Sequence, residues 1–373
     1  MTRRIDIIAG ARPNFMKIAP IIRALERRIA AGRALRYRLI HTGQHYDARM
    51  SGDFFCQLGI PAPDLNLEVG SGSQAEQTAA IMTRYEKVLI EARSDLCMVV
   101  GDVTSTMACA IVAKKLGIPV AHVEGGIRSG DWSMPEEINR IVTDAITDYF
   151  FTTSEVANAN LRNSGVPDRR IFFVGNTMID TLLHNLARLK PPSFWDEYRL
   201  GKVGYFVLTL HRPANVDDKD RLVNMLTAVA NGTCGLPIVF PVHPRTRKRL
   251  ETVKLPAVTN TLRFVEPQGY LEFGYLLKNA KAIITDSGGI TEEATVLGIP
   301  CLTVRDTTER PETVTIGTNE LVGTNPTNVK PALDRLFAGK WKRGGIPPLW
   351  DGKTSERIVG HLERLLAERG TWA

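Results

Sequence analysis

The chain has 373 residues, of which 43% are hydrophobic and 23% charged, and its formal net charge is +7. This length allows two domains, and the composition excludes a low-complexity or disordered protein. No apolar run approaches the roughly 18 residues of a membrane span, and no signal-peptide pattern precedes the first strand. We therefore expect a cytoplasmic protein without a membrane partner.

The positive charge is local. Residues 1–50 hold 11 Lys and Arg against 3 Asp and Glu, whereas the remainder of the chain is nearly balanced. The basic run RALERRIAAGRALRYR has the pattern of the solvent face of a helix and its following turn, which we favour over a nucleic-acid surface. The five cysteines are scattered without CxxC spacing, so neither a disulfide framework nor a zinc site is expected.

Short β-branched runs alternate with helical periodicity along the whole chain, which is typical of parallel sheets connected by helices. The first half contains the strand candidates IDIIAG, YRLIHTG, LCMVVGD, PVAHVEGG, DYFFTTS and IFFVGN. The second half restarts the series with YFVLTLHR, PIVFPVHP, LRFVEP, KAIITDSGG and PCLTVRD. A Pro pair near residue 190 separates the two series. The sequence therefore predicts an α/β fold with two Rossmann-like, doubly wound halves.

Five of the predicted strands are followed by polar side chains, which are Arg12, Asp102, Glu124, His211 and Ser287. Ligands of open α/β sheets bind at the carboxyl ends of the strands. We therefore expect these side chains to converge in a cleft between the two halves. A metal site is a rival interpretation of the histidine and carboxylates, but the HExxH spacing is missing, so acid and base catalysis fits better.

The stretch HVEGGIRSGDWSMPEEINR, residues 122–140, carries two acids of interest. Glu124 follows an apolar strand, where an unpaired carboxylate is costly and where a raised pKa suits a general acid or base. Glu136 has the S-x-x-E spacing with Ser133 that indicates a capping box, and spacing alone favours this bland interpretation. The helix that follows places an apolar stripe between Ile138 and Ile146.

Two stretches of the second half have the composition of an anion site. The run TDSGGITEEA, residues 285–294, indicates a strand, a glycine turn and a helix whose free amides attract phosphate, although its glycines can be purely steric. Glu293 can accept hydrogen bonds from ribose hydroxyls. Arg310, within RDTTERPET, belongs either to a salt-bridged surface loop or to a site that faces an anion at Ser287. No GxGxxG or Walker A motif supports NAD or ATP binding.

The chain resembles the non-hydrolysing UDP-N-acetylglucosamine 2-epimerases over nearly its whole length. The stretches that carry the resemblance are, in order, ARPNFMKIAP, HTGQHYD, GDVTST, HVEGGIRSGDWSMPEEINR, GNTMIDTL, LHRPANV, PVHPRT, TDSGGITEEATVLGIP and RDTTERPETVTIGTN. The resemblance implies a GT-B-like pair of Rossmann-like domains, at residues 1–188 and 189–355, that face each other across a cleft. It also implies that residues 356–373 form a helix packing back on the first domain, and that the protein is a homodimer.

The resemblance further implies a reversible C2 epimerisation of UDP-N-acetylglucosamine to UDP-N-acetylmannosamine, without metal or other cofactor. A base removes the C2 proton as UDP leaves C1, which gives 2-acetamidoglucal, and re-addition of UDP follows protonation on the opposite face. By position, the catalytic groups match Asp102, Glu124, Glu136 and His211. The diphosphate neighbourhood matches Arg12, Lys17, Ser287, Gly288, Gly289 and Arg310, the uracil side matches Gln268 and Phe273, and the ribose contact matches Glu293.

Within this set, Asp102 and Glu136 are expected to share the C2 proton transfers, with Glu124 orienting or relaying and His211 near the leaving diphosphate. The chain departs from the family at Asn14, where many members have Glu. In the family's second, activating site Gln44 and His45 match, but Asp47 replaces Gln, which argues against activation by substrate. The alternatives are an epimerase of another UDP-sugar such as a diacetamido uronic acid, a hydrolysing relative, a glycosyltransferase and a non-enzymatic regulator.

Overall fold

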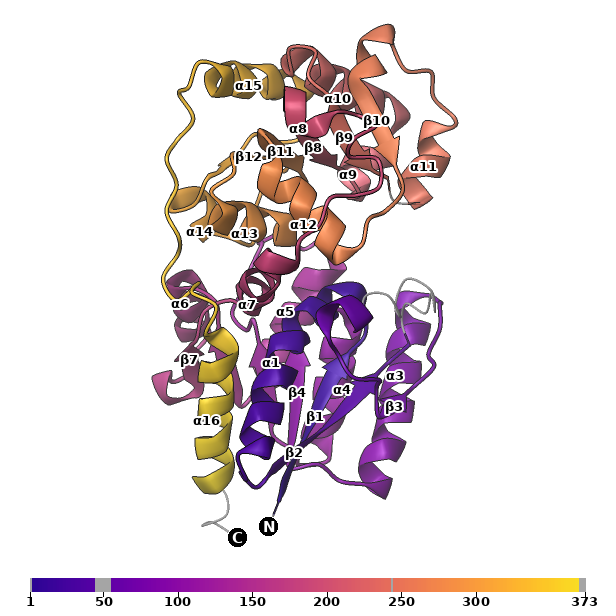
Figure 1. Cartoon of the computed structure of the whole chain (residues 1–373). Helices are drawn as coiled ribbons and strands as arrows, with labels where there is room; N and C mark the ends of the chain where they lie inside the picture. Colours follow the sequence, from indigo (N-terminus) through magenta and orange to yellow (C-terminus); the bar gives the residue numbers. More distant parts are fainter. Residues whose placement is uncertain (1, 44–54, 243, 369–373) are drawn as a thin grey trace. The chain divides into compact units, whose positions relative to one another are not determined.

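The computed structural model describes residues 2–43, 55–242 and 244–368 of the chain, which form two compact units (Figure 1). Unit 1 consists of Met1–His184 and Pro348–Ala373, and unit 2 consists of Asn185–Pro347. The chain therefore leaves unit 1 once and returns to it at the end. The sequence predicts boundaries after residues 188 and 355, and the units divide after His184 and Pro347.

Unit 1 contains a seven-stranded sheet in the order β3-β2-β1-β4-β5-β6-β7, and its paired strands are parallel. Its central strands are buried apolar runs, as expected for a sheet covered on both faces. The strands are β1 (Arg3–Ala9), β2 (Leu35–His41), β3 (Leu65–Asn66), β4 (Leu96–Val100), β5 (Val120–Val123), β6 (Tyr149–Thr152) and β7 (Ile171–Phe173).

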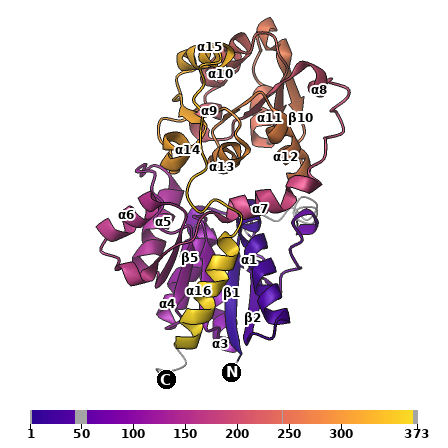
Figure 2. The ribbon, with the colours of Figure 1, turned by 60° about the vertical axis from the view of Figure 1, so that its left-hand side comes forward.

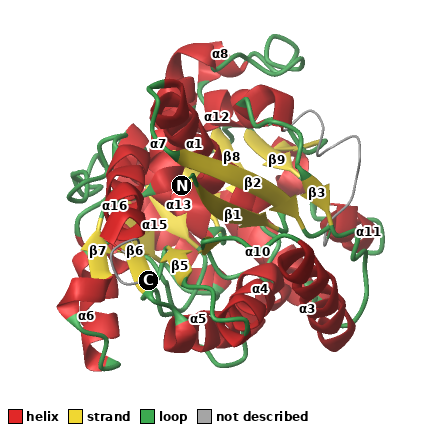
Figure 3. Cartoon of the chain, turned by 90° about the horizontal axis from the view of Figure 1, so that it is seen from below, coloured by secondary structure: helices red, strands yellow, loops and turns green. Residues whose placement is uncertain are grey.

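Helices cover both faces of this sheet. Figure 3 shows α3, α4 and α5 on one face, and α1 and α16 on the other. The sequence signals of α3 include a capping box, because Ser73 Oγ accepts from Glu76 N and the Glu76 carboxylate accepts from Ser73 N. The helices of unit 1 whose bounds lie within the described residues include α1 (Arg12–Ala30), α3 (Gln74–Glu91), α4 (Thr104–Lys115), α5 (Pro135–Ile146), α6 (Glu155–Asn163), α7 (Thr177–Asn185) and α16 (Thr354–Glu368).

The last helix, α16, returns to unit 1 and lies beside α1 (Figure 2). The Asp180 carboxylate, on α7, accepts the backbone N–H groups of Thr354 and Ser355 at 3.0 and 2.7 Å and so caps the start of α16. Just before the helix, the Trp350 indole donates to the Thr153 carbonyl at 3.0 Å. Side chains of α7 and of the segment before α16 therefore fasten the returning chain to unit 1.

Unit 2 contains a six-stranded parallel sheet in the order β10-β9-β8-β11-β12-β13. Its strands are β8 (Phe206–Thr209), β9 (Ile238–Pro241), β10 (Leu262–Val265), β11 (Ala282–Thr285), β12 (Cys301–Thr303) and β13 (Asn319–Leu321). Its helices are α8 (Leu200–Val203), α9 (Pro213–Val216), α10 (Lys219–Gly232), α11 (Pro244–Leu250), α12 (Tyr270–Asn279), α13 (Gly288–Leu297), α14 (Pro311–Thr315) and α15 (Val329–Phe337).

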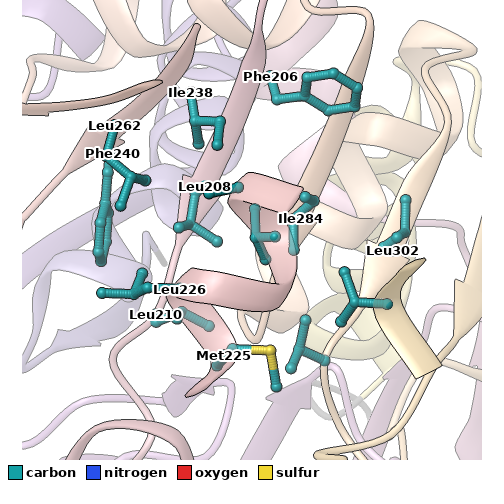
Figure 4. Packing of buried hydrophobic residues seen from close by; sticks show 14 of the residues in the cluster. Phe206, Leu208, Leu210, Met225, Leu226, Ile238, Phe240, Leu262, Ile284 and Leu302 are labelled. Atoms are coloured by element: carbon teal, nitrogen blue, oxygen red, sulfur yellow. The ribbon is translucent and has the colours of Figure 1, made fainter. Parts of the chain in front are cut away.

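The core of unit 2 forms where α10 packs on the sheet. Figure 4 shows side chains of the strands and of α10 interdigitating, namely Phe206, Leu208, Leu210, Met225, Leu226, Ile238, Phe240, Leu262, Ile284 and Leu302. The prediction of two α/β halves with parallel sheets is confirmed, and the short strands β3 and β13 are additions to the predicted series. Among the helices of the described residues, none is both long and apolar enough to cross a membrane.

Candidate active site

Both sheets have the strand order of the Rossmann fold, and each reverses direction at one place. In unit 1 the reversal lies between β1 and β4, and in unit 2 it lies between β8 and β11. Ligands bind at such switch points, outside the carboxyl ends of the strands. Asp102 follows β4, whereas His211 and Ser287 follow β8 and β11. The residues selected from the sequence therefore belong to the two positions where this fold offers a site.

Glu124 occupies a strained and buried position directly after β5. Its φ of 72° is unusual for a residue other than glycine, and its side chain is only 2% exposed. The carboxylate Oε2 lies 2.7 Å from Lys17 Nζ, on α1, so the buried negative charge is paired. Strain of about 1–3 kcal/mol persists where the surroundings over-determine a conformation, and such positions cluster at functional sites.

Asp102 is held by α5. Arg140 donates from Nε and Nη2 to Asp102 Oδ2, at 3.0 and 2.8 Å, and Asn139 Nδ2 donates to the Asp102 backbone carbonyl at 2.9 Å. The Asp102 side chain keeps 30% of its surface exposed. The contacts fix the carboxylate without sealing it, which is what a group that exchanges protons with a ligand requires.

A second carboxylate, Glu137, holds Arg140 from the other side. Arg140 Nη1 pairs with Glu137, and the backbone N–H groups of Ser129 and Gly130 donate to the same carboxylate. Burial by itself would raise the pKa of Glu137, but the two N–H groups and Arg140 outweigh it, so the pKa lies below its usual value. An ionised Glu137 therefore keeps the guanidinium aimed at Asp102.

The face that α5 buries is polar. Its buried residues are Glu137, Asn139, Arg140, Thr143 and Asp144. The apolar stripe predicted between Ile138 and Ile146 lies on the more open side, where Ile138 is 46% exposed. The helix is thus positioned by charge and hydrogen bonds to the strand ends.

Glu136 is not part of a capping box, so this interpretation is wrong. Helix α5 begins at Pro135 with Met134 as the N-cap residue and without a side-chain cap, because Ser133 Oγ donates instead to Asp131 Oδ1 at 2.6 Å. Glu136 lies in the first turn of α5, four residues before Arg140, and residues at this spacing are neighbours on a helix surface. Glu136 and Arg140 therefore belong to neighbouring positions on the surface of α5.

Behind Asp102 and Glu124 lies a fully buried histidine, His122. Its Nδ1 is 2.8 Å from Asp144 Oδ1 and its Nε2 is 2.7 Å from the Gly101 carbonyl. Asp144 also accepts from Arg128 Nη1 at 2.6 Å. Burial would raise the pKa of Asp144, but His122 and Arg128 lower it overall. This network ties the ends of β4 and β5 to α5.

In unit 2 the start of α13 has the geometry of an anion site. Ser287 is the N-cap residue but makes no side-chain cap, and Gly288 and Gly289 form the first turn. The helix dipole and the first N–H groups of such a turn favour a negatively charged ligand. The predicted strand, turn and helix at residues 285–294 are therefore confirmed as local structure.

Asp286 fixes His211 beside this turn. The buried carboxylate accepts from the backbone N–H of His211 and Arg212, and its Oδ1 lies 2.8 Å from His211 Nδ1. Burial would raise the pKa of Asp286, but the His211 and Asn215 contacts lower it overall. Since the His211 side chain remains 51% exposed, it is oriented and yet accessible.

Three arginines gather near the α13 start together with two acids. Arg310 pairs with Glu292, Arg305 Nη2 lies 2.5 Å from Glu309 Oε2, and Arg212 Nη2 lies 3.5 Å from Glu309 Oε1. The side chains of these pairs other than that of Arg212 are nearly completely buried. Arg310 is therefore salt-bridged, as one interpretation expects, but it is not on the surface.

Glu293 is buried in α13, and burial raises its pKa to about 7 despite the hydrogen bond that Tyr270 donates to it at 3.1 Å. Phe273, one turn later in α12, packs partly on the hydrophobic cluster beneath the sheet. Gln268 donates to the Glu266 carbonyl at 2.7 Å in the loop before α12. The start of α12 thus contacts α13 through Tyr270 and Glu293.

Comparison with known proteins gives the family. The family model for UDP-N-acetylglucosamine 2-epimerase matches residues 27–363. The curated UDP-N-acetylglucosamine 2-epimerase of Methanocaldococcus jannaschii is 43% identical over 367 residues, which are 95% of this chain and 98% of that protein. The chain belongs to the UDP-N-acetylglucosamine 2-epimerase family. It is therefore an isomerase that acts on carbohydrates.

Two further relatives of this epimerase family bear on the substrate. The crystal structure of the Methanocaldococcus jannaschii UDP-GlcNAc 2-epimerase in complex with UDP-GlcNAc and UDP has a TM-score of 0.87, with 96% of this chain and 99% of that chain covered at 43% identity. The UDP-2,3-diacetamido-2,3-dideoxy-D-glucuronate 2-epimerase of Pseudomonas aeruginosa is 38% identical over 97% of this chain and 100% of that protein. The family thus includes epimerases named for two different UDP-sugars.

Some residues selected from the family resemblance lie outside the described structure. These are Gln44, His45 and Asp47, and the side chain of Arg12, whose backbone begins α1. Asn14, where many members have Glu, uses both ends of its amide: Oδ1 accepts from the N–H of Gly10 and Ala11, and Nδ2 donates to the Val100 carbonyl at 2.9 Å. A carboxylate cannot make the last of these bonds.

The sequence did not single out the residues that bind the selected side chains, or those that hold these partners in turn. The direct partners are Arg140, Asp286, Glu292 and Tyr270. The residues around them are His122, Glu137, Asp144, Arg212 and Glu309. One signal in the sequence could have indicated Arg140. It lies four residues after Glu136, and residues at this spacing share one face of a helix. Among the described residues, no three His, Cys, Asp or Glu side chains lie close enough to hold a metal ion.

Proposed function

We propose that this protein epimerises UDP-N-acetylglucosamine at C2 to give UDP-N-acetylmannosamine, by elimination and re-addition of UDP. The observation that carries the proposal is the 43% identity, over almost the full length, to a UDP-GlcNAc 2-epimerase with a solved UDP-GlcNAc and UDP complex. The acids at the switch point of unit 1 and the anion-binding turn of unit 2 support it independently.

In the proposed reaction unit 1 supplies the proton transfers at C2. The C2 hydrogen beside an acetamido group is not acidic, so the C1–O bond must break as the proton is removed, and the electron pair of C2–H forms the C1–C2 double bond. Asp102 and Glu136 act on opposite faces of C2, one as base and the other as acid. Arg140 pairs with Asp102 and orients it, and Lys17 pairs with Glu124, which orients or relays.

Unit 2 stabilises the UDP that leaves and returns. The uncapped start of α13 and the guanidinium of Arg310 neutralise the diphosphate, while His211, oriented by Asp286, supplies or removes a proton at its oxygen. Glu293 accepts hydrogen bonds from the ribose, and the α12 region with Gln268 and Phe273 contacts the uracil. Re-addition of the diphosphate oxygen to C1 after protonation of C2 completes the epimerisation.

Incubation with UDP-N-acetylglucosamine in D2O, followed by proton NMR, tests the proposal. We expect loss of the C2 proton signal and formation of UDP-N-acetylmannosamine with deuterium at C2. Free N-acetylmannosamine would identify the hydrolysing reaction instead. Absence of both exchange and product would overturn the proposal for this substrate.

A second substrate has a specific basis. The Pseudomonas relative is named for UDP-2,3-diacetamido-2,3-dideoxy-D-glucuronate, and its identity of 38% is close to that of the first relative. The same NMR experiment with this sugar discriminates the two. Deuterium exchange only with the uronate would move the assignment to that substrate without changing the reaction.

A further inference from the structure

The start of α13 already has a carboxylate beside it. A Cβ atom built on Gly288, the first residue of the helix, would come within 2.7 Å of Glu309 Oε1. The Glu309 side chain is only 8% exposed, and no side chain of Ser287 caps the helix. Because a helix start attracts anions, Glu309 lies in the neighbourhood where the proposed function requires the diphosphate of the substrate.

Glu309 also holds the cations that a diphosphate would use. Its Oε2 lies 2.5 Å from Arg305 Nη2, and its Oε1 lies 3.5 Å from Arg212 Nη2. Arg310 is the next residue and is held by Glu292. Burial would raise the pKa of Glu309, but Arg305, Arg310 and Arg212 outweigh it and hold the pKa well below its usual range, so the group remains charged.

We propose that Glu309 is a positioning residue that acts as an internal competitor of the diphosphate. In the ligand-free protein it neutralises and orders Arg212 and Arg305, which would otherwise repel each other beside the helix start. An incoming diphosphate meets this carboxylate as a like charge and competes with it for the same guanidinium groups. The inference rests on the proposed function, because it takes UDP as the ligand of this turn.

Such a competitor suits a reaction in which UDP departs and must attack again. Binding that is equally strong for every bound state does not accelerate the chemical step. A UDP diphosphate that several cations neutralise completely is also a poorer nucleophile toward C1. Glu309 lowers the affinity for free UDP while keeping the cations in place. Its removal should therefore tighten UDP binding and slow turnover together.

The test compares Glu309→Gln with wild type by calorimetric titration of UDP and of uridine. We expect the dissociation constant of UDP to fall on the order of tenfold, because a buried like charge is removed, with uridine binding unchanged and kcat for epimerisation reduced. Glu320→Gln is the matched control, since it removes the same charge from a Glu–Arg pair of unit 2, with Arg335, and should leave UDP binding unchanged.

Equal or weaker UDP binding by a folded Glu309→Gln protein would overturn the inference and leave the proposed function intact. Absence of UDP binding by the wild-type protein would overturn both. If Glu309→Gln does not fold, Glu309→Asp provides the same test, because the shorter carboxylate withdraws from Gly288 and should tighten UDP binding severalfold. No tightening in that variant would also overturn the inference.

Discussion

The two sheets have the same strand order, but the charged residues at the carboxyl ends of their strands differ. In unit 1 two acids that follow strands are each held by a cation, Asp102 after β4 by Arg140 and Glu124 after β5 by Lys17. In unit 2 three arginines surround an uncapped helix start, and acids hold the arginines. The same topology therefore holds paired carboxylates in one unit, where we propose proton transfer, and an uncapped helix start in the other, where we propose diphosphate binding.

The largest effect is expected from Asp102→Asn in unit 1. The substitution removes the proton acceptor while retaining the shape, so kcat should fall by about 10³-fold, whereas UDP binding, assigned to unit 2, should be unchanged. Asp95→Asn is the matched control, because Asp95 precedes β4 at the opposite end of the strand and pairs with Arg3. Steady-state rates and UDP titration check both. If Asp102→Asn lost UDP binding as strongly as it lost kcat, the assignment of UDP binding to unit 2 would be wrong.

Glu136→Gln should follow, with a loss of about 10²-fold in kcat, because it removes the acid proposed for the second face of C2. Its matched control is Glu155→Gln, which changes a glutamate in the first turn of the neighbouring helix α6. Deuterium exchange at C2 measured by NMR is the direct observable. Unchanged exchange in Glu136→Gln would show that this glutamate takes no part in proton transfer.

Arg140→Lys should reduce kcat by about tenfold. Lysine keeps the charge, but it cannot bind Asp102 and Glu137 in the way a guanidinium does. The UDP affinity of Arg140→Lys should remain that of the wild type. Arg140→Met leaves both carboxylates without their cation and should destabilise the protein by about 3 kcal/mol. Thermal unfolding and kinetics separate the two results. A lysine variant with full activity would show that Asp102 needs only the charge.

A smaller, pH-dependent effect is expected at Glu293 in unit 2. Its pKa of about 7 means that the carboxyl is mostly neutral at pH 6 and mostly ionised at pH 8. Because the ionised form accepts both ribose hydroxyl donors, uridine should bind severalfold more tightly at pH 8. The titration uses uridine instead of UDP, because the terminal phosphate of UDP itself titrates at a pH of about 6 and would add its own pH dependence. Glu293→Gln should lose the dependence, and a dependence that survives would assign it to another group.

The smallest effect is expected on the open side of α5. Ile138→Ser should change the free energy of unfolding by less than about 0.5 kcal/mol, because this side chain is 46% exposed. Leu161→Ser, in the adjacent helix α6 and fully buried, should cost about 3 kcal/mol. Denaturant unfolding compares the two. If both variants lost the same free energy of unfolding, the side chain of Ile138 would be buried in solution.

The strand series and the residues after the strands could be predicted because parallel strands in a buried sheet have a strong apolar signal and end in short polar turns. The buried face of α5 could not be predicted from the sequence. Its apolar periodicity indicates the stripe between Ile138 and Ile146 and gives no sign of the buried polar face. On that face Arg140 pairs with Asp102, which lies 38 residues earlier in the chain. Long-range ion pairs of this kind leave no local pattern.

The unit 2 site shows the same limit. The glycine turn at residues 287–289 is readable, since it combines a strand, small residues and a helix. The approach of Glu309 to Gly288 depends on the path of the loop after β12, which composition does not determine. Asp286 was hidden for a different reason, because its role is to bind the backbone of another strand end, at His211 and Arg212.

Because α16 returns to unit 1, the two units can complete their folding only in a certain order during synthesis. This helix buries Ile358, Val359 and Leu362 and lies beside α1, which left the ribosome more than 300 residues earlier. All of unit 2 emerges first, so it can complete its sheet while unit 1 still lacks one wall of its core. The apolar surface of unit 1 that α16 covers is therefore exposed until α16 has been synthesised.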